Sequence, residues 1–183
     1  DTKMTINTKT LAAIDIGTNA IRLFISNVEE YPTETLFKKI AFLRVPIRLG
    51  EDVFTTGEIG QQKRKRLCET MQGFSYIMSA FNVESYKAYA TCAMREARNG
   101  KSVAEQIQKE CDLNIEIISG TKEAETIFAG GMNEVVDDDK TYLYVDVGGG
   151  STEVIVYSKS VKVEACSFPL GTVRMLNDAV DKE

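Results

Sequence analysis

The 183-residue chain is organised around one stretch, Val145-Asp146-Val147-Gly148-Gly149-Gly150-Ser151-Thr152-Glu153, which places three consecutive glycines between two carboxylates. Apolar and β-branched residues flank it, at 141–147 and 152–157, and predict two strands joined by a tight connection. Residues without a Cβ let several backbone N–H groups converge on one point, where they can bind phosphate oxygens. Asp146 and Glu153 offer hard oxygen ligands suited to Mg²⁺.

Two interpretations of this stretch are open on this pattern alone. It predicts either a phosphate cradle beside a metal site or an ordinary turn, which is the commoner role of glycines between strands. The remainder of the chain has to decide between them.

Composition limits the chemistry that the chain can carry. With 43% hydrophobic residues it can bury a core in one large or two small domains. The net charge of −5, from 22 basic and 27 acidic residues, gives no sign of a protein steered to nucleic acid by bulk charge. Histidine is absent, which excludes Ser-His-Asp and Cys-His pairs and imidazole metal sites within these residues. Acid or base chemistry in this segment must therefore use carboxylates.

The cysteines and the apolar runs indicate a cytoplasmic protein. Four cysteines are widely spaced without a CxxC pattern, which argues against a zinc site or a disulfide framework. No apolar run approaches the length of a membrane span, and the N-terminus lacks the apolar core of a signal peptide. We expect neither a membrane nor a nucleic-acid partner. Residues 1–10 form a polar lead-in, which we expect to be flexible and outside the fold.

The hydrophobic pattern predicts alternating groups of strands and helices. The loop between the third strand and the first helix is expected at Pro46, Gly50 and Gly57. The basic run 63–66 is interpreted as a solvated helix face rather than a polyanion site. The predicted strands are 11–16, 20–28, 36–45, 85–91, 115–118, 141–147, 152–157 and 161–167, and the predicted helices are 58–81, 94–111 with an interruption at 99–100, 121–130, and one after Gly171.

A repeat accompanies this order of elements. Ala13-Ile14-Asp15-Ile16-Gly17-Thr18 and Tyr144-Val145-Asp146-Val147-Gly148-Gly149 both consist of an apolar strand, an aspartate, one apolar residue and glycine. Each leads into a second strand. Two related half-units facing each other would bring two glycine turns and two aspartates to one cleft.

Four segments carry a resemblance to a known family. They are 15–19 together with Arg22, Thr91-Cys92-Ala93-Met94-Arg95-Glu96-Ala97-Arg98-Asn99, Ile118-Ser119-Gly120-Thr121-Lys122-Glu123-Ala124, and 146–153. In this order and spacing they resemble the exopolyphosphatase and guanosine pentaphosphate phosphohydrolase (Ppx/GppA) family, within the superfamily of actin, sugar kinases and heat-shock chaperone ATPases.

The resemblance implies an α/β fold of two ribonuclease H-like, actin-like ATPase lobes with mixed sheets flanked by helices. Residues 1–130 would form the first lobe and 131–183 the front half of the second. The second lobe would be incomplete, because the family's continues beyond residue 183. A homodimer is the expected assembly.

The resemblance also implies roles for individual residues. Glu123 looks like the base that activates water, and its place near a helix start favours its ionised form. Asp146 and Glu153 look like Mg²⁺ ligands, and Asp15 would complete the acidic cluster. The phosphate-binding residues implied are Gly17, Thr18, Asn19, Arg22, Arg95, Gly148, Gly149, Ser151 and Thr152.

Some residues depart from the family pattern. Cys92 stands where the family usually has serine, and Lys122 and Glu125 exchange the charges that usually flank the glutamate. Leu170-Gly171-Thr172-Val173-Arg174 also resembles a family segment, without an assigned role.

Three functions are compatible with this sequence. The first is a Mg²⁺-dependent hydrolase that releases terminal orthophosphate from polyphosphate, guanosine pentaphosphate or both. The second is a module of the same superfamily that senses a nucleotide or polyphosphate without cleaving it, and the third is an ATP-dependent sugar or acid kinase. Glu123 favours the hydrolase, because a sensor would not need a base. The sequence does not choose between polyphosphate and a guanosine penta- or tetraphosphate as ligand.

Overall fold

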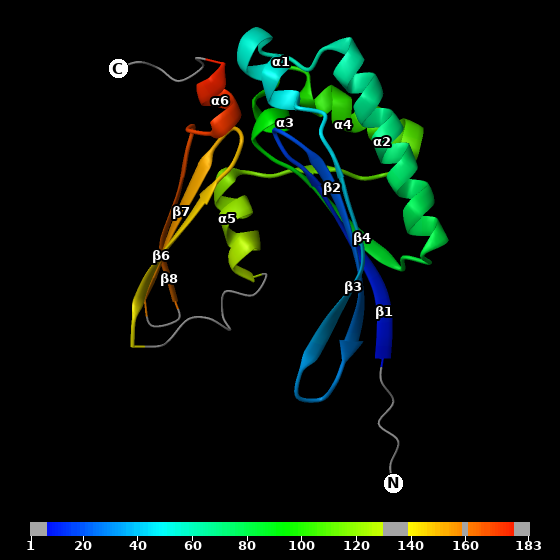
Figure 1. The fold of residues 1–183 in the computed structure, drawn as a ribbon, viewed down its shortest axis with the longest axis vertical. Coiled ribbons are helices and arrows are strands. Elements are labelled where there is room, and N and C mark those ends of the chain that lie inside the picture. The colour runs from blue at the N-terminus through cyan, green and yellow to red at the C-terminus, as the bar shows by residue number, and fades with distance from the viewer. Residues whose placement is uncertain (1–6, 130–138, 159–160, 178–183) are drawn as a thin grey trace.

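The computed structural model describes residues 7–129, 139–158 and 161–177. They form two sheets that stand side by side with helix α5 between them, as Figure 1 shows. Among the described residues, no helix is long and apolar enough to cross a bilayer.

The first sheet has five strands in the order β3-β2-β1-β4-β5. β1, β2 and β3 are joined by antiparallel pairing, whereas β4 pairs parallel to β1 and β5 parallel to β4. The sheet is therefore mixed, as predicted. The strands are β1 (Asn7–Ile16), β2 (Ile21–Glu30), β3 (Thr35–Val45), β4 (Ser85–Ala90) and β5 (Glu116–Ile117).

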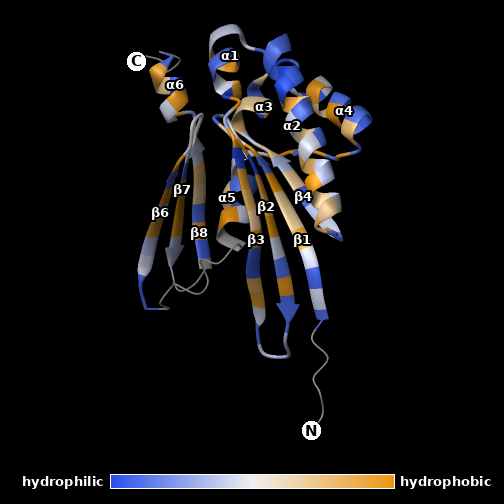
Figure 2. Cartoon of the chain, turned by 45° about the vertical axis from the view of Figure 1, so that its right-hand side comes forward, coloured by the Kyte–Doolittle hydropathy of each residue, from blue (hydrophilic) through white to orange (hydrophobic). Residues whose placement is uncertain are grey.

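One face of this sheet forms the main core. Ile14, Ile16, Leu23 and Ile25 are at most 2% exposed and face helices α2 (Gln61–Ala80) and α4 (Gly100–Cys111). Apolar and polar residues alternate along the strands of both sheets in Figure 2, as expected when one face is covered. The other face of the first sheet looks toward α5.

Two short helices lie at the top of the first sheet. α3 (Cys92–Glu96) follows β4, and α1 (Leu49–Thr56) lies where a loop had been predicted from Gly50. That prediction was wrong because Gly50 serves packing and not a turn: a Cβ there would lie 2.3 Å from Thr18 Cγ2. The basic run lies on helix α2, as predicted, but it is not solvated throughout, because the Lys63 side chain is 15% exposed and forms ion pairs with Glu51 and Asp52 of α1.

The second sheet has three antiparallel strands in the order β6-β7-β8. Ile155 and Tyr157 are fully buried against Ala124 of α5. Helix α6 closes the described chain. These elements are β6 (Thr141–Val147), β7 (Thr152–Ser158), β8 (Val161–Phe168), α5 (Gly120–Ala129) and α6 (Thr172–Leu176).

Two predicted boundaries, that of the N-terminal lead-in and that between the lobes, differ from those in the structure. The lead-in 1–10 was expected outside the fold, but Asn7–Thr10 belongs to β1 and pairs with the end of β2; residues 1–6 lie outside the described part. The predicted boundary at residue 130 assigns α5 to the first lobe, whereas α5 contacts β7 and β8. Its side chains join the second core, so the two packing units separate near residue 119.

Candidate active site

The two strand turns are built in the same way. Gly17 N–H donates to the carbonyl of Ala20 over 3.2 Å, and Gly148 N–H donates to the carbonyl of Ser151 over 2.9 Å. The repeat seen in the sequence is thus a repeat of hydrogen bonds as well.

The residues that flank the turns occupy equivalent positions. Asp15 lies directly opposite Arg22 across β1 and β2, and Asp146 lies directly opposite Glu153 across β6 and β7. The first turn therefore carries a carboxylate and a cation, whereas the second carries two carboxylates.

The turns approach each other closely, and this explains the glycines. A Cβ on Gly149 would lie 3.1 Å from Thr18 Cβ, and one on Gly150 would lie 2.8 Å from Thr18 Oγ1 and 2.5 Å from Cys92 Sγ. Among the described glycines only Gly57 has a positive φ. The glycine run is therefore needed for contact between the lobes, more than for a left-handed turn.

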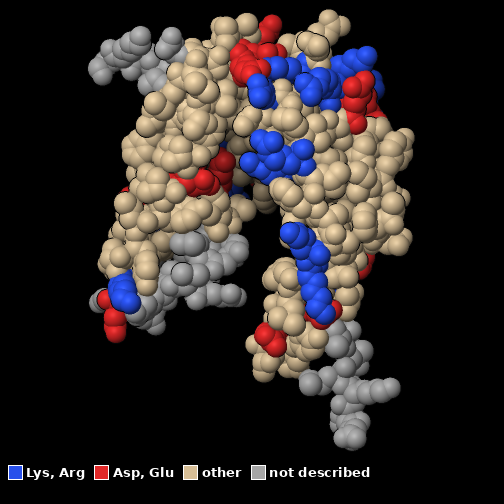
Figure 3. All heavy atoms as spheres, viewed as in Figure 1, with Lys and Arg blue, Asp and Glu red and all other residues tan. Residues whose placement is uncertain are grey.

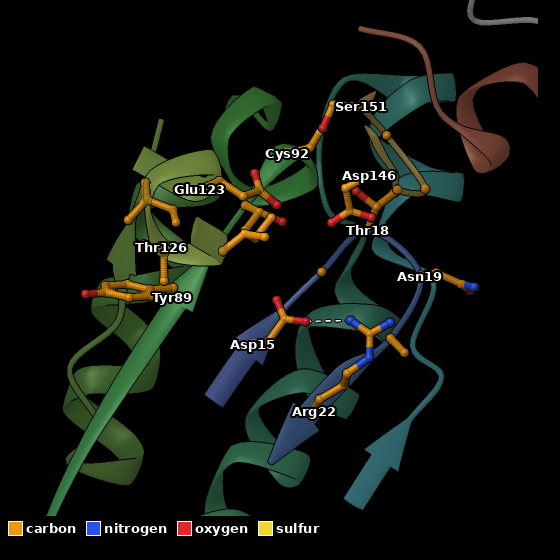
Figure 4. Close-up of a pocket in the computed structure, with 18 of the residues that line it drawn as sticks. Asp15, Thr18, Asn19, Arg22, Tyr89, Cys92, Glu123, Thr126, Asp146 and Ser151 are labelled. Carbon is orange, nitrogen blue, oxygen red and sulfur yellow. Dashed lines mark hydrogen bonds and ion pairs between the residues drawn. The ribbon is translucent and has the colours of Figure 1, made fainter. Parts of the chain in front are cut away.

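A cavity of about 780 Å³ opens between the two turns and α5. It brings together most of the predicted site residues, and Figure 4 shows Glu123, Asp15 and Asp146 around one space, with Asn19 pointing away from them. Eleven predicted residues line the cavity: Asp15, Gly17, Thr18, Asn19, Arg22, Glu123, Asp146, Gly148, Gly149, Ser151 and Glu153.

Two predicted phosphate ligands do not line the cavity. Thr152 is buried, and its hydroxyl donates to the carbonyl of Leu170 over 2.5 Å. Arg95 lies behind Glu123, donating to the Ile118 carbonyl over 2.7 Å, with its Nη1 3.7 Å from Glu123 Oε2. In this state Arg95 positions Glu123 and does not face the cavity.

Glu123 lies in the first turn of α5 with a side chain only 21% exposed. Its Oε2 is buried without a hydrogen-bond partner. Burial, followed by the charges of Glu153 and Asp15, raises the pKa of this carboxyl to about 7 against the opposing effect of Arg95. The prediction that the helix N-terminus favours the ionised form was wrong in direction, since desolvation outweighs the helix dipole.

This raised pKa makes the stability of the protein depend on pH. The folded chain holds a proton on Glu123 that the unfolded chain releases above about pH 4.5, so ionisation destabilises the fold progressively up to pH 7. We expect Glu123→Gln to raise the free energy of unfolding at pH 8, by at most about 3 kcal/mol, and to change it little at pH 4. Urea unfolding at the two pH values measures this, and an equal effect at both would contradict the assignment.

The remaining carboxylates differ in their surroundings. Asp15 pairs with Arg22 Nη1 at 2.5 Å, and both side chains are 44% exposed. Glu153 is 2% exposed and accepts a hydrogen bond of 2.8 Å from the Ser167 hydroxyl. Asp146 is half-buried beside it. The neighbouring basic groups do not fully neutralise these carboxylates, since Glu153 and Asp15 raise the Glu123 pKa. The excess negative charge fits a site for a cation.

Arg174 is a residue whose role the sequence left unassigned. It is 9% exposed in α6, where Nε donates to the Gly150 carbonyl over 2.8 Å and Nη2 contacts Glu96 Oε1 over 2.6 Å. Its guanidinium also lies 4.1 Å from the ring centroid of Phe54. Arg174 therefore ties the glycine turn of the second lobe to α3 and α1 of the first. Only its place in a family-like segment could have marked it.

Fold and site together define a two-lobed α/β protein with a cleft between two glycine turns. Comparison with known proteins shows to which family the chain belongs. Residues 13–183 match the Ppx/GppA phosphatase family, and the chain belongs to that family.

Relatives and solved structures agree with this. An exopolyphosphatase structure from Cytophaga hutchinsonii superposes with a TM-score of 0.83 at 29% identity, over 93% of this chain and 53% of that one. The Aquifex aeolicus family member gives 0.78 at 26% identity, over 92% of this chain and 54% of that one. The predicted actin-like ATPase fold is confirmed by these neighbours.

One curated relative is a bifunctional 3-dehydroquinate synthase/phosphatase of Fusobacterium nucleatum, 32% identical over 168 residues, which are 90% of this chain and 25% of that protein. Another is exopolyphosphatase 2 of Mycobacterium tuberculosis, 28% identical over 170 residues, 90% of this chain and 53% of that protein. The chain thus spans between a quarter and about half the length of these relatives.

Proposed function

We propose that this chain is part of a Mg²⁺-dependent phosphohydrolase that releases terminal orthophosphate from inorganic polyphosphate or guanosine pentaphosphate, with Glu123 activating the attacking water. One observation carries the proposal. Glu123 lines the cavity between the turns, its carboxyl has a pKa of about 7, and its buried Oε2 makes no hydrogen bond and has only the ion pair with Arg95. A general base is most effective when its pKa lies near the working pH. The exopolyphosphatase relatives support the substrate class.

The chain's own groups divide the remaining work. The N–H groups of the turns and the hydroxyls of Thr18 and Ser151 orient phosphoryl oxygens. Arg22 supplies a cation at the first turn, where Asp15 fixes its direction. Arg95 keeps the Glu123 carboxylate aimed at the cavity. Hydrolysis of a phosphoanhydride depends mainly on such positioning and charge stabilisation.

Asp146 and Glu153 are the proposed Mg²⁺ ligands, directly or through water. Among the described residues no group of three His, Cys, Asp or Glu could hold a metal by itself. Mg²⁺ commonly uses one or two carboxylates, with waters and substrate phosphates completing its shell, so this donor set fits. When bound there, Mg²⁺ would neutralise charge on the phosphoryl oxygens.

The test is phosphate release by the full-length protein from the two substrates side by side. We expect release with Mg²⁺ and its loss when EDTA removes the metal, because the cavity then lacks a counter-charge for the phosphates. Cleavage of neither substrate would favour the sensor, and release unaffected by EDTA would contradict the role of Asp146 and Glu153.

A further inference from the structure

Two successive rows of side chains cross the face of the first sheet that looks toward α5. The row next to the turns, here called the cationic row, runs across four strands by register as Arg44, Arg22, Asp15 and Tyr89. The following row, here called the aromatic row, runs as Phe42, Phe24, Ala13 and Lys87. The cavity between the turns extends over all four residues of the aromatic row.

We propose that the aromatic row is a stacking subsite for the planar base of a nucleoside whose phosphates lie at the turns. The preferred ligand is then a nucleoside polyphosphate, and not an inorganic polyphosphate chain. The inference rests on the proposed function, because it places that function's phosphates at the turn end of the same cavity.

The first observation is the exposed aromatic pair. Phe24 and Phe42 face each other across β2 and β3, and they remain 36% and 54% exposed inside the cavity. Aromatic faces stack on every nucleobase, at about 1–3 kcal/mol per base. Phosphate oxygens gain nothing from such a surface.

The second observation is the shortage of cations along the cavity. A polyphosphate chain needs positive charge along its whole length, because each unit carries a negative charge. Along the cavity the aromatic row supplies one cation, Lys87, and the cationic row supplies Arg22, since Arg44 does not line the cavity. Arg22 is already paired with Asp15. In Figure 3, basic side chains gather on the first lobe at the cleft, opposite acidic ones.

The third observation is the distance from the phosphate end. Residues two apart on a strand point to the same side and lie about 7 Å apart. Phe24 and Phe42 therefore follow Arg22 and Arg44 by one step on the same face. Along the strands, cations come first and a pair of aromatic rings second, which matches the order of phosphate and base in a nucleotide.

The experiment compares GTP with inorganic tripolyphosphate, which carry the same three-phosphate chain and differ by the nucleoside. Calorimetric titration uses the full-length protein with Mg²⁺ in the Glu123→Gln background, so that binding is read without turnover. Phe24→Ala and Phe42→Ala test the subsite, Phe24→Leu tests the ring while keeping apolar bulk, and Phe37→Ala is the matched control. Phe37 is also on β3 and is 70% exposed, but it does not line the cavity.

We expect Kd for GTP to rise about ten-fold in each subsite variant, with Kd for tripolyphosphate unchanged and no effect of Phe37→Ala. GTP binding that is unaffected by the subsite variants would overturn the inference. Equal losses for both ligands would overturn it too, since they would show damage to the phosphate end. Phosphate release by the wild type tests the proposed function separately from these titrations.

Discussion

Replacing Glu123 with glutamine should lower phosphate release about 10²- to 10⁴-fold while leaving substrate binding intact. Glutamine keeps the shape of the side chain and its contact with Arg95 but cannot accept a proton from water. The Oε2 of Glu123 is buried without a hydrogen-bond partner and lies 3.7 Å from Arg95 Nη1, so the glutamine keeps this contact when its amide oxygen takes that position. Single-turnover phosphate release measures the rate, and calorimetry with tripolyphosphate measures binding.

Glu125→Gln is the matched control. It lies on the same helix but pairs with Lys162 over 3.0 Å at an exposed position away from the cavity. Its variant should release phosphate at the wild-type rate. If the Glu123 variant did the same, the base would have to be another carboxylate, and the mechanism proposed above would fail.

Replacing Arg174 with methionine should destabilise the protein by about 2–4 kcal/mol and loosen the glycine turn. The variant removes a buried cation that bridges the Gly150 carbonyl and Glu96, and it leaves Glu96 with only the Cys92 thiol as donor. The estimate lies below that for a fully buried pair because the Glu96 side chain is 38% exposed. Urea unfolding measures the loss, and tripolyphosphate affinity reports the turn.

Arg98→Met serves as the control for this substitution. Arg98 also donates to a backbone carbonyl, that of Thr56 over 2.8 Å, but its side chain is 68% exposed. Its loss should cost less than about 1 kcal/mol. Equal effects of the two substitutions would show that Arg174 does not join the lobes. Unchanged tripolyphosphate affinity in Arg174→Met would show that the turn holds its shape without it.

Local pattern was enough to predict most of the fold. Strand β6 was predicted with its observed ends, and β7 and β8 to within one residue, because alternating β-branched residues stop at glycine turns. Helical spacing predicted an apolar stripe of Leu67, Met71, Phe74, Met78 and Phe81. The first four are buried on α2, whereas Phe81 is 41% exposed at the end of the helix. Helix α1 was missed, since the reason for Gly50 is the proximity of Thr18, which is distant in sequence.

The residues of the candidate site were predicted from the sequence, but their arrangement in space was not. Family resemblance indicated Glu123 correctly as a cavity residue, yet its pKa depends on burial and on Glu153 and Asp15, which only the fold brings near. Thr152 looks like a phosphate ligand in sequence, and only the chain path shows that its hydroxyl is used by Leu170. Contacts between residues that are separated along the chain leave no local pattern.

The two turns share one hydrogen-bond plan, yet Arg22 stands in the first where Glu153 stands in the second. In the proposed reaction neither turn is sufficient alone, because the first would hold the anion and the second would hold the cation that neutralises it. The proposed hydrolysis therefore requires both turns to be present and to face each other. The side chains beside each turn can therefore differ in charge while the hydrogen bond that shapes the turn stays the same.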